Sequence, residues 1–206
     1  SIEDISYRIL PAPHFLIKDS ILLSNSSKSE KSIGEIKDLK IFLDQMNFFD
    51  KEKMIIKKVI INNANFSLLR WDLKELNNST IHKFSNKKIH INKSNIFFKD
   101  SLDEIVAIIK INKANFFFND KELQNQFDLK GNVFAIPFTF ELKSENDLII
   151  KKNFSFKAKS LNLDIYNSYI ARTDNSTVGS NVISFFNSVI KTKFKSIDGN
   201  IVFTSK

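Results

Sequence analysis

The chain contains no cysteine, only four glycines and three prolines, and no long apolar run. Without cysteine it has no disulfide bonds and no thiolate metal sites, and its redox compartment stays open. Its apolar stretches are only a few residues long, whereas a helix that crosses a bilayer needs about 20 apolar residues. The four glycines stand apart from one another, so the chain has no glycine-rich phosphate-binding loop.

Arginine is also scarce. The formal net charge is +8, but Arg8, Arg70 and Arg172 are the only arginines, and the lysines are scattered along the chain. Recognition of bases and phosphates favours the planar fork of arginine and a clustered basic patch. Abundant Ile, Asn, Lys and Phe are typical of an A/T-rich genome, in which lysine is mainly a solvated surface residue. We therefore do not expect a nucleic-acid partner.

The residue types that carry catalysis or bind metals form no recognisable constellation. His14, His82 and His90 lack the spacing of metal ligands. Asp103 and Glu104 are adjacent, so a strand would point them to opposite faces, which is unsuited to paired acid–base catalysis. Nothing resembles a nucleophile elbow or a metal-binding loop. The sequence predicts a non-enzymatic protein without a metal or cofactor.

Alternating large apolar residues dominate the chain, which has 21 phenylalanines. A period of two places alternate side chains on one face of a strand. Pro137 lies within one such run and indicates an edge position or a bulge there. The clearest runs are Phe15, Ile17, Ile21 and Leu23; Leu39, Ile41 and Leu43; and Phe134, Ile136, Phe138, Phe140 and Leu142.

Polar turn signals separate these runs, and we expect about ten strands in meander order. Two stretches favour helix instead. Residues 70–78 ("RWDLKELNN") predict a short helix, and residues 180–194 predict a longer one. In the second stretch Val182, Phe185, Phe186, Val189 and Ile190 recur at helical spacing. We expect residues 1–206 to form a single β-rich domain, because a chain of this length favours one core.

A decapeptide pattern occurs three times, as "IINNANFSLL" (60–69), "IHINKSNIFF" (89–98) and "IKINKANFFF" (109–118). In each copy the parity of the apolar residues flips partway, for example between Ile61 and Ala64. A one-residue slip moves side chains to the other face of a strand. Either a β-bulge restores the face, or the strand bends and covers something else. The pattern predicts a kinked strand laid down repeatedly, each copy adding an apolar rung to a common face.

Two architectures fit these phenylalanine-rich strands. In one, they form the closed core of a β-sandwich, with two inner faces packed together. In the other, they line an apolar trough on a long curved sheet that never closes on a second sheet. Periodicity does not separate the two, and taken alone it favours the closed core.

A family resemblance favours the trough. Residues 7–23 ("YRILPAPHFLIKDSILL") and 33–70 ("IGEIKDLKIFLDQMNFFDKEKMIIKKVIINNANFSLLR") resemble the AsmA-like family. Pro11 and Pro13 match the Pro-x-Pro that begins its first strand, and residues 39–43 match the strand that pairs with it.

Later segments extend the likeness to about residues 5–142. Residues 55–69 are similar to the family's strand with the hydrophobic rung, and 84–100 and 127–142 are similar to the strands that follow. Gly131 stands where the family has a glycine-led strand. The chain has "RWDLKELNN" where the family commonly has an Asp-Gly-x-x-Asn-Trp turn.

The resemblance implies a mainly β fold, a long curved antiparallel meander that forms an open hydrophobic trough with one or two short helices. The family is related to the chorein-type bridge-like lipid carriers. Its members lie in the periplasm of Gram-negative bacteria, anchored to the inner membrane, and are linked to phospholipid movement towards the outer membrane. We therefore expect a non-enzymatic module that conducts phospholipid acyl chains and supports outer-membrane biogenesis. Its expected partners are phospholipids, the membrane through an anchor outside this chain, and other envelope proteins.

The candidate lining of the trough is drawn from the alternating runs and the decapeptides. Acyl chains in such a groove avoid water at roughly 0.8 kcal/mol per CH₂. About ten strands at about 4.8 Å spacing would give a trough of about 50 Å. The alternative is a structural or adhesive β-sandwich with a closed phenylalanine-rich core. The lining candidates are Phe15, Ile17, Leu39, Ile41, Phe66, Leu68, Ile96, Phe98, Phe116, Phe118, Phe134, Ile136, Phe138 and Phe140.

Overall fold

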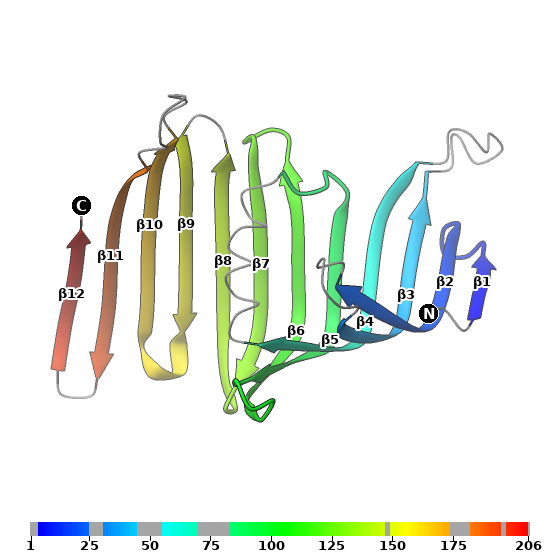
Figure 1. The fold of residues 1–206 in the computed structure, drawn as a ribbon, viewed down its shortest axis with the longest axis horizontal. Helices are drawn as coiled ribbons and strands as arrows, with labels where there is room; N and C mark the ends of the chain where they lie inside the picture. The colour runs from blue at the N-terminus through cyan, green and yellow to red at the C-terminus, as the bar shows by residue number, and fades with distance from the viewer. Residues whose placement is uncertain are drawn as a thin grey trace.

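The described residues form a single twelve-stranded sheet. Each strand lies beside its neighbours in the sequence, so the sheet runs as a meander from β1 to β12 and is open at both edges (Figure 1). From residue 169 onward only the backbone is described. The computed structural model describes residues 4–24, 31–44, 55–69, 83–146, 149–173, 182–194 and 197–205.

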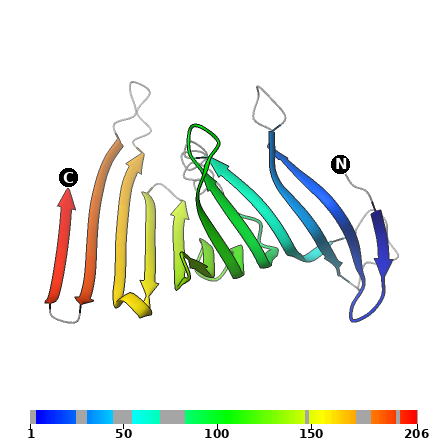
Figure 2. The same cartoon turned by 90° about the horizontal axis from the view of Figure 1, so that it is seen from below.

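The mainly β, curved and unclosed fold expected from the sequence is confirmed (Figures 1 and 2). Within the described residues no second sheet packs on the first, so the closed sandwich is wrong. One short 3-10 helix, η3 (Lys159–Leu161), joins the ninth and tenth strands. The strands are β1 (Asp4–Arg8), β2 (His14–Ser24), β3 (Lys31–Leu43), β4 (Ile56–Leu69), β5 (Lys88–Lys99), β6 (Ile105–Asn119), β7 (Gln124–Val133), β8 (Ile136–Asn146), β9 (Ile149–Ala158), β10 (Leu163–Thr173), β11 (Val182–Phe194) and β12 (Ile197–Ser205).

The helix predicted over residues 180–194 is wrong, because β11 occupies Val182–Phe194 and pairs with β10 and β12 along its length. Val, Ile and Phe favour strands, and short apolar pairs fit either period. Two neighbouring strands satisfy the backbone here, and that tertiary context outweighs the helical spacing. The short helix predicted over residues 70–78 lies outside the described residues.

One neighbouring pair departs from the antiparallel pattern. β4 and β5 are parallel, and their residues match with a constant offset, so that Asn62 lies beside Asn92 and Asn65 beside Asn95. The first two decapeptides therefore lie side by side, each residue of the first beside the residue 30 positions later. A parallel neighbour needs a crossover connection, unlike the hairpins elsewhere in the sheet.

Five exposed residues interrupt the regular pairing of β2 to β6. The ladders skip each of them, and they lie opposite one another from strand to strand. Asp19, Asn63 and Lys93 have positive φ angles of 48°, 55° and 48°. We call these residues the kink row: Asp19, Lys37, Asn63, Lys93 and Asn112.

The kink row restores the face of each strand after the parity flip. Ile61 pairs with Ile91, and three residues later the backbone N–H of Ala64 donates to Ser94 Oγ at 3.0 Å. The cross-strand rows through these two positions both reach the buried cluster on β6 and β7. The face is therefore restored in all three decapeptides, but a register shift of the β-bulge kind accompanies this only at Asn112, against β7. The same interruption at Asp19 moves Ile21 to the face opposite Ile17, which simple alternation failed to predict.

The sheet bends where the kink row crosses it. In Figure 1 the blue-to-teal strands turn sharply near the lower edge of the view, and Figure 2 shows the resulting curvature from below. An extra residue in a strand increases its local bend and twist. Aligned across five strands, these residues give the sheet its curvature.

The core lies on one face of the sheet. Its buried centre consists of Ile111, Ala114, Leu129, Phe138 and Ala158, which come from four successive strands. Partly buried apolar residues from β4 to β10 pack around them. Each strand therefore contributes to the same apolar surface.

Candidate functional site

The candidate site is the apolar face of the sheet, which the strand register assembles row by row. One row crosses ten strands with apolar residues throughout: Ile5, Ile17, Leu39, Ile61, Ile91, Ala114, Leu129, Phe140, Phe156 and Ile165. The adjacent row runs through Tyr7, Phe15, Ile41, Val59, Ile89, Phe116, Phe127, Leu142 and Phe154. We call the surface formed by these rows and the parallel rows beside them the apolar face.

Thirteen of the fourteen lining candidates lie on this face. Phe66, Leu68, Ile96 and Phe98 come from the paired decapeptides, and Ile136 pairs with Val133. The exception is Phe134, which the structure places in the β7–β8 turn with 72% of its surface exposed. The candidates on the face are Phe15, Ile17, Leu39, Ile41, Phe66, Leu68, Ile96, Phe98, Phe116, Phe118, Ile136, Phe138 and Phe140.

The prediction for Phe134 fails because it begins the strand too early. Phe134 and Ala135 have positive φ angles of 50° and 62°, which together form a tight two-residue turn. Neither residue is a usual turn former, so residue type does not indicate a turn at these positions. Pro137 lies in β8 opposite Asn132 and has no register partner on β9, because the β8–β9 ladder begins at Thr139. It therefore occupies a local edge position, as the sequence predicts, and its missing N–H does not interrupt that ladder.

Aromatic rings contact one another along the middle of the apolar face. Phe138 and Phe156 stack with centroids 5.2 Å apart, and Phe140 lies 6.0 Å from Phe127 and 6.1 Å from Phe154. Such ring pairs favour a fixed packing beyond the area that they bury. The rings form a preorganised apolar surface.

Much of the apolar face is only half-buried. Within the described ranges no other sheet lies over it. A few of its large residues, such as Ile111 and Phe138, are buried, whereas most of the others keep part of their surface accessible. A contiguous exposed apolar surface of this kind marks an interaction or ligand-binding site.

The opposite face is mainly polar from β4 to β10. The asparagines of the first two decapeptides form a ladder there, in which Asn92 Nδ2 donates to Asn62 Oδ1 at 3.1 Å and Asn95 Nδ2 donates to Asn65 Oδ1 at 2.9 Å. His90 Nδ1 lies 2.6 Å from Asn115 Oδ1. The repeated asparagines in the sequence were a signal for this ladder, which the sequence analysis missed.

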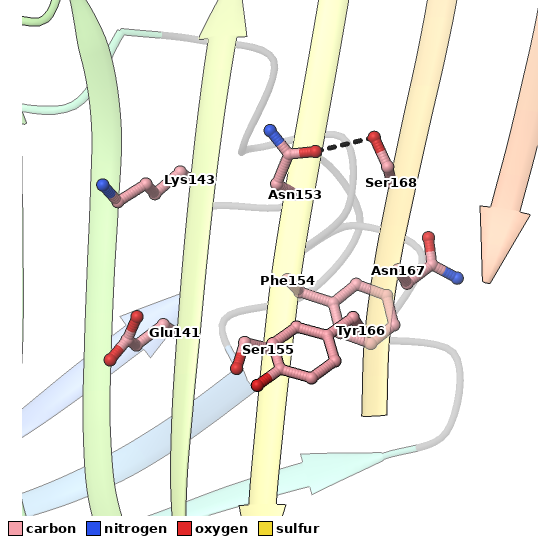
Figure 3. Close-up of a pocket in the computed structure, with 8 residues that line it drawn as sticks. All are labelled: Glu141, Lys143, Asn153, Phe154, Ser155, Tyr166, Asn167 and Ser168. Atoms are coloured by element: carbon pink, nitrogen blue, oxygen red, sulfur yellow. Dashed lines mark hydrogen bonds between the residues drawn. The ribbon is translucent and has the colours of Figure 1, made fainter. Parts of the chain in front are cut away.

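A shallow hollow of about 290 Å³ lies between β8 and β10 (Figure 3). Its polar lining includes Glu141, Ser155 and Tyr166, and Ser168 Oγ donates to Asn153 Oδ1 at 2.7 Å. A hydrogen bond to Tyr166 raises the pKa of the neighbouring exposed Lys157. The lining brings together no nucleophile with a base and no paired carboxylates, so we assign it no chemistry.

Histidines and carboxylates in the described residues serve structural contacts. His14 stacks on Phe42 at 4.8 Å, and its Nδ1 lies 2.8 Å from the Ala12 carbonyl oxygen. Asp103 pairs with Lys99 at 3.1 Å. No group of potential metal ligands occurs in the described ranges. His82 lies outside them.

No known family model matches this chain, and no curated protein sequence matches it significantly. Within the described residues no helix is long and apolar enough to span a membrane. The likeness to the AsmA-like family is therefore a hypothesis that rests on the residues quoted above and on what the trough can do.

Proposed function

We propose that this chain is a non-enzymatic lipid-conducting module, whose apolar face holds the acyl chains of phospholipids. The observation that carries the proposal is the continuous row of apolar residues that crosses ten strands of an unclosed sheet. A protein without a ligand gains little from such a surface, since water contacts it. An acyl chain fits it because both are extended and apolar.

The energetics support acyl-chain binding. About ten buried CH₂ groups would contribute about 8 kcal/mol before the cost of ordering the chain. The described part of the face has no deep pocket with convergent polar groups, which a tightly recognised ligand would need. A uniform lining lets chains slide from one strand to the next.

The wider role follows from the family resemblance. We propose that the full-length protein is anchored in the inner membrane of a Gram-negative bacterium, with this segment in the periplasm, and that it supports outer-membrane biogenesis. Envelope proteins at either end of the sheet would be its partners. This part of the proposal concerns the cellular location and the partners of the protein, and it is tested separately from lipid binding.

The lipid-binding test compares two adjacent residues on β9. Phe154 lies on the apolar face, whereas Ser155 lies on the polar face, and both are half-buried. Native mass spectrometry of the mildly extracted wild-type chain, with lipid analysis, should detect bound phospholipid. Phe154→Asp should retain at least about tenfold less lipid, because a carboxylate on the lining repels acyl chains.

Ser155→Asp is the matched control and should retain lipid as the wild type does. Circular dichroism should show the same strand content in all three proteins. A well-folded wild-type chain without any lipid would contradict the proposal. Equal loss in both variants would mean that the bound lipid does not lie on the apolar face.

A further inference from the structure

The two faces of the sheet differ in charge as well as in polarity. Among the register-paired residues of β1 to β10, the polar face carries Lys, Asp and Glu, such as Lys143, Glu141 and Lys157. From β4 to β10 the register-paired rows of the apolar face contain no Asp or Glu and a single charged residue, Lys152. Over these strands the apolar face therefore has one cationic position.

Lys152 lies at one end of the apolar face, in a row that changes from apolar to polar. Its register partner is Ser144, which pairs in turn with Asn125 and through it with Phe118. Asn125 and Ser144 are 2% and 1% exposed, and Asn125 Nδ2 donates to Ser144 Oγ at 3.4 Å. Asn125 Oδ1 also accepts the backbone N–H of Phe84 at 2.7 Å. These contacts hold the polar row in place.

The next row along the strands is apolar from β7 to β9 and ends at Asn167 on β10. Phe154 follows Lys152 on the same face of β9, and Leu142 and Phe127 lie beside it on β8 and β7. Alternate residues of a strand are about 7 Å apart, so the ammonium group borders directly on the acyl-binding surface. A cation at the border of an apolar groove matches an anionic amphiphile.

The surroundings of Lys152 favour an anion over a neutral or cationic group. Burial lowers the pKa of Lys152, because the apolar surroundings disfavour its charged form. An anion bound at Lys152 would stabilise the charged form of this lysine.

We propose that Lys152 binds the headgroup phosphate of a phospholipid whose acyl chain runs along β9 and β8 over Phe154, Leu142 and Phe140. This inference rests on the proposed lipid-conducting function and adds to it the polarity of the bound lipid. The headgroup lies where β8 and β9 connect, and the acyl chain extends towards Ala158, about 20 Å away along the strand. Lipids entering at this position all share one orientation.

The test uses two lipids with the same chain, 1-oleoyl-lysophosphatidate and monooleoylglycerol, each below its aggregation concentration. The wild-type chain should bind the phosphate-bearing lipid about tenfold more tightly, measured by native mass spectrometry or calorimetry. Lys152→Met keeps the apolar stem and removes the charge. It should abolish most of this preference while leaving the affinity for monooleoylglycerol within about twofold.

Two controls complete the design. Lys151→Met removes an adjacent lysine that pairs with Glu145 at 3.4 Å on the polar face, and it should leave the preference unchanged. Lys152→Arg should retain the preference. A wild-type chain that binds both lipids equally, or a preference that survives in Lys152→Met, would overturn the headgroup site and leave the proposed function standing.

Two other outcomes would overturn the proposed function or the identity of the bound phosphate. Binding of neither lipid would overturn the proposed function, and the headgroup site with it. Millimolar inorganic phosphate, if it binds to Lys152 without any acyl chain and does so as tightly as the lipid, would show a free-phosphate site instead. Weak binding of inorganic phosphate alongside tight binding of the lysophosphatidate is the result that supports the proposal.

Discussion

The kinked half of the sheet, β2 to β6, and the straight half, β7 to β10, build the same apolar face by different sequence rules. In the straight half, apolar residues two apart suffice, as in Ile136, Phe138 and Phe140 on β8. In the kinked half, one interval in each strand is three residues, as between Ile61 and Ala64. The extra residue is exposed, and the face continues across it.

This comparison explains why the chain repeats a decapeptide. A kink in one strand alone would put its neighbours out of register. Matching kinks in neighbouring strands keep the ladders aligned, and so Lys93 lies opposite Asn112 without a register shift. β7 has no such residue, and the β6–β7 ladder shifts by one residue at Asn112. The kinks therefore stay aligned across β2 to β6, of which β4, β5 and β6 carry the decapeptide.

The largest expected effect is at the boundary between the two halves. Gly131 on β7 pairs with Ile111, next to the shift, and a Cβ at this position would collide with the backbone oxygen of Lys110. Because a backbone cannot move aside as a side chain can, Gly131→Ala should lower the free energy of unfolding by about 2–3 kcal/mol. Urea denaturation followed by circular dichroism measures the change.

Gly34 on β3 provides the matched comparison within the kinked half. A Cβ there would lie 2.8 Å from Cδ1 of Phe66, a side chain that can turn. Gly34→Ala should therefore cost less, about 0.5–1 kcal/mol. Equal losses in the two variants would contradict the view that the boundary is the more tightly constrained position.

A smaller effect of opposite sign is expected within the kink row. Lys93 has a φ of 48°, which costs a residue with a Cβ roughly 1–2 kcal/mol. Lys93→Gly removes this strain but adds the entropy of glycine, so we expect a net gain of about 0.5–1 kcal/mol in unfolding free energy. Asn63, with a φ of 55°, is already a residue type that tolerates this conformation. Asn63→Gly should change stability little. A large gain there would contradict the view that the gain at Lys93 comes from relief of positive-φ strain.

The next prediction concerns the asparagine ladder on the polar face of the kinked half. The hydrogen bond between Asn95 and Asn65 spans the parallel pair β4–β5 at 2.9 Å. A double-mutant cycle with Asn65→Ala and Asn95→Ala should give a coupling free energy of about 0.5–1 kcal/mol. A cycle between Asn65 and Asn153, which lies on β9 in the straight half, should give none. Coupling in the second cycle would mean that the effects are not local.

The two halves also differed in how far the sequence predicted them. Alternation placed Ile136, Phe138 and Phe140 correctly, because a straight strand needs only a period of two. In the kinked half the flipped parity of the decapeptides revealed an irregularity, but their positive φ angles were not encoded by glycine. Ile21 was misplaced for the same reason, since nothing in "IKDSIL" marks Asp19 as a kink.

The pairing of strands that lie far apart in the sequence was the other feature that could not be predicted from the sequence. The parallel register of β4 and β5 depends on where the intervening chain returns, and local sequence does not specify that. The helix expected at 180–194 was a strand because β10 and β12 supply its backbone partners. Thirteen of the lining candidates share one face because each lies in a run whose apolar residues face the same side, and their role as a lipid lining stays a prediction. Lys152 was not among the candidates, because one lysine among many has no periodic signal.

The smallest expected effect is on the pH dependence of stability, and it isolates Lys152 in the straight half. Burial lowers the pKa of Lys152 in the folded chain below the usual 10.5. Between the folded and the unfolded pKa, the unfolded chain therefore binds more protons than the folded chain. Stability should therefore rise with pH through that window, and Lys152→Met should remove this rise. Lys152 is partly solvated, so we expect only a few tenths of a kcal/mol. Denaturation of the wild type, Lys152→Met and Lys151→Met at pH 7 and pH 10 measures this change in unfolding free energy.

A bound lysophosphatidate should reduce the rise of wild-type stability with pH, because an anion at the ammonium group returns the pKa of Lys152 towards its unfolded value. Monooleoylglycerol should leave this rise unchanged.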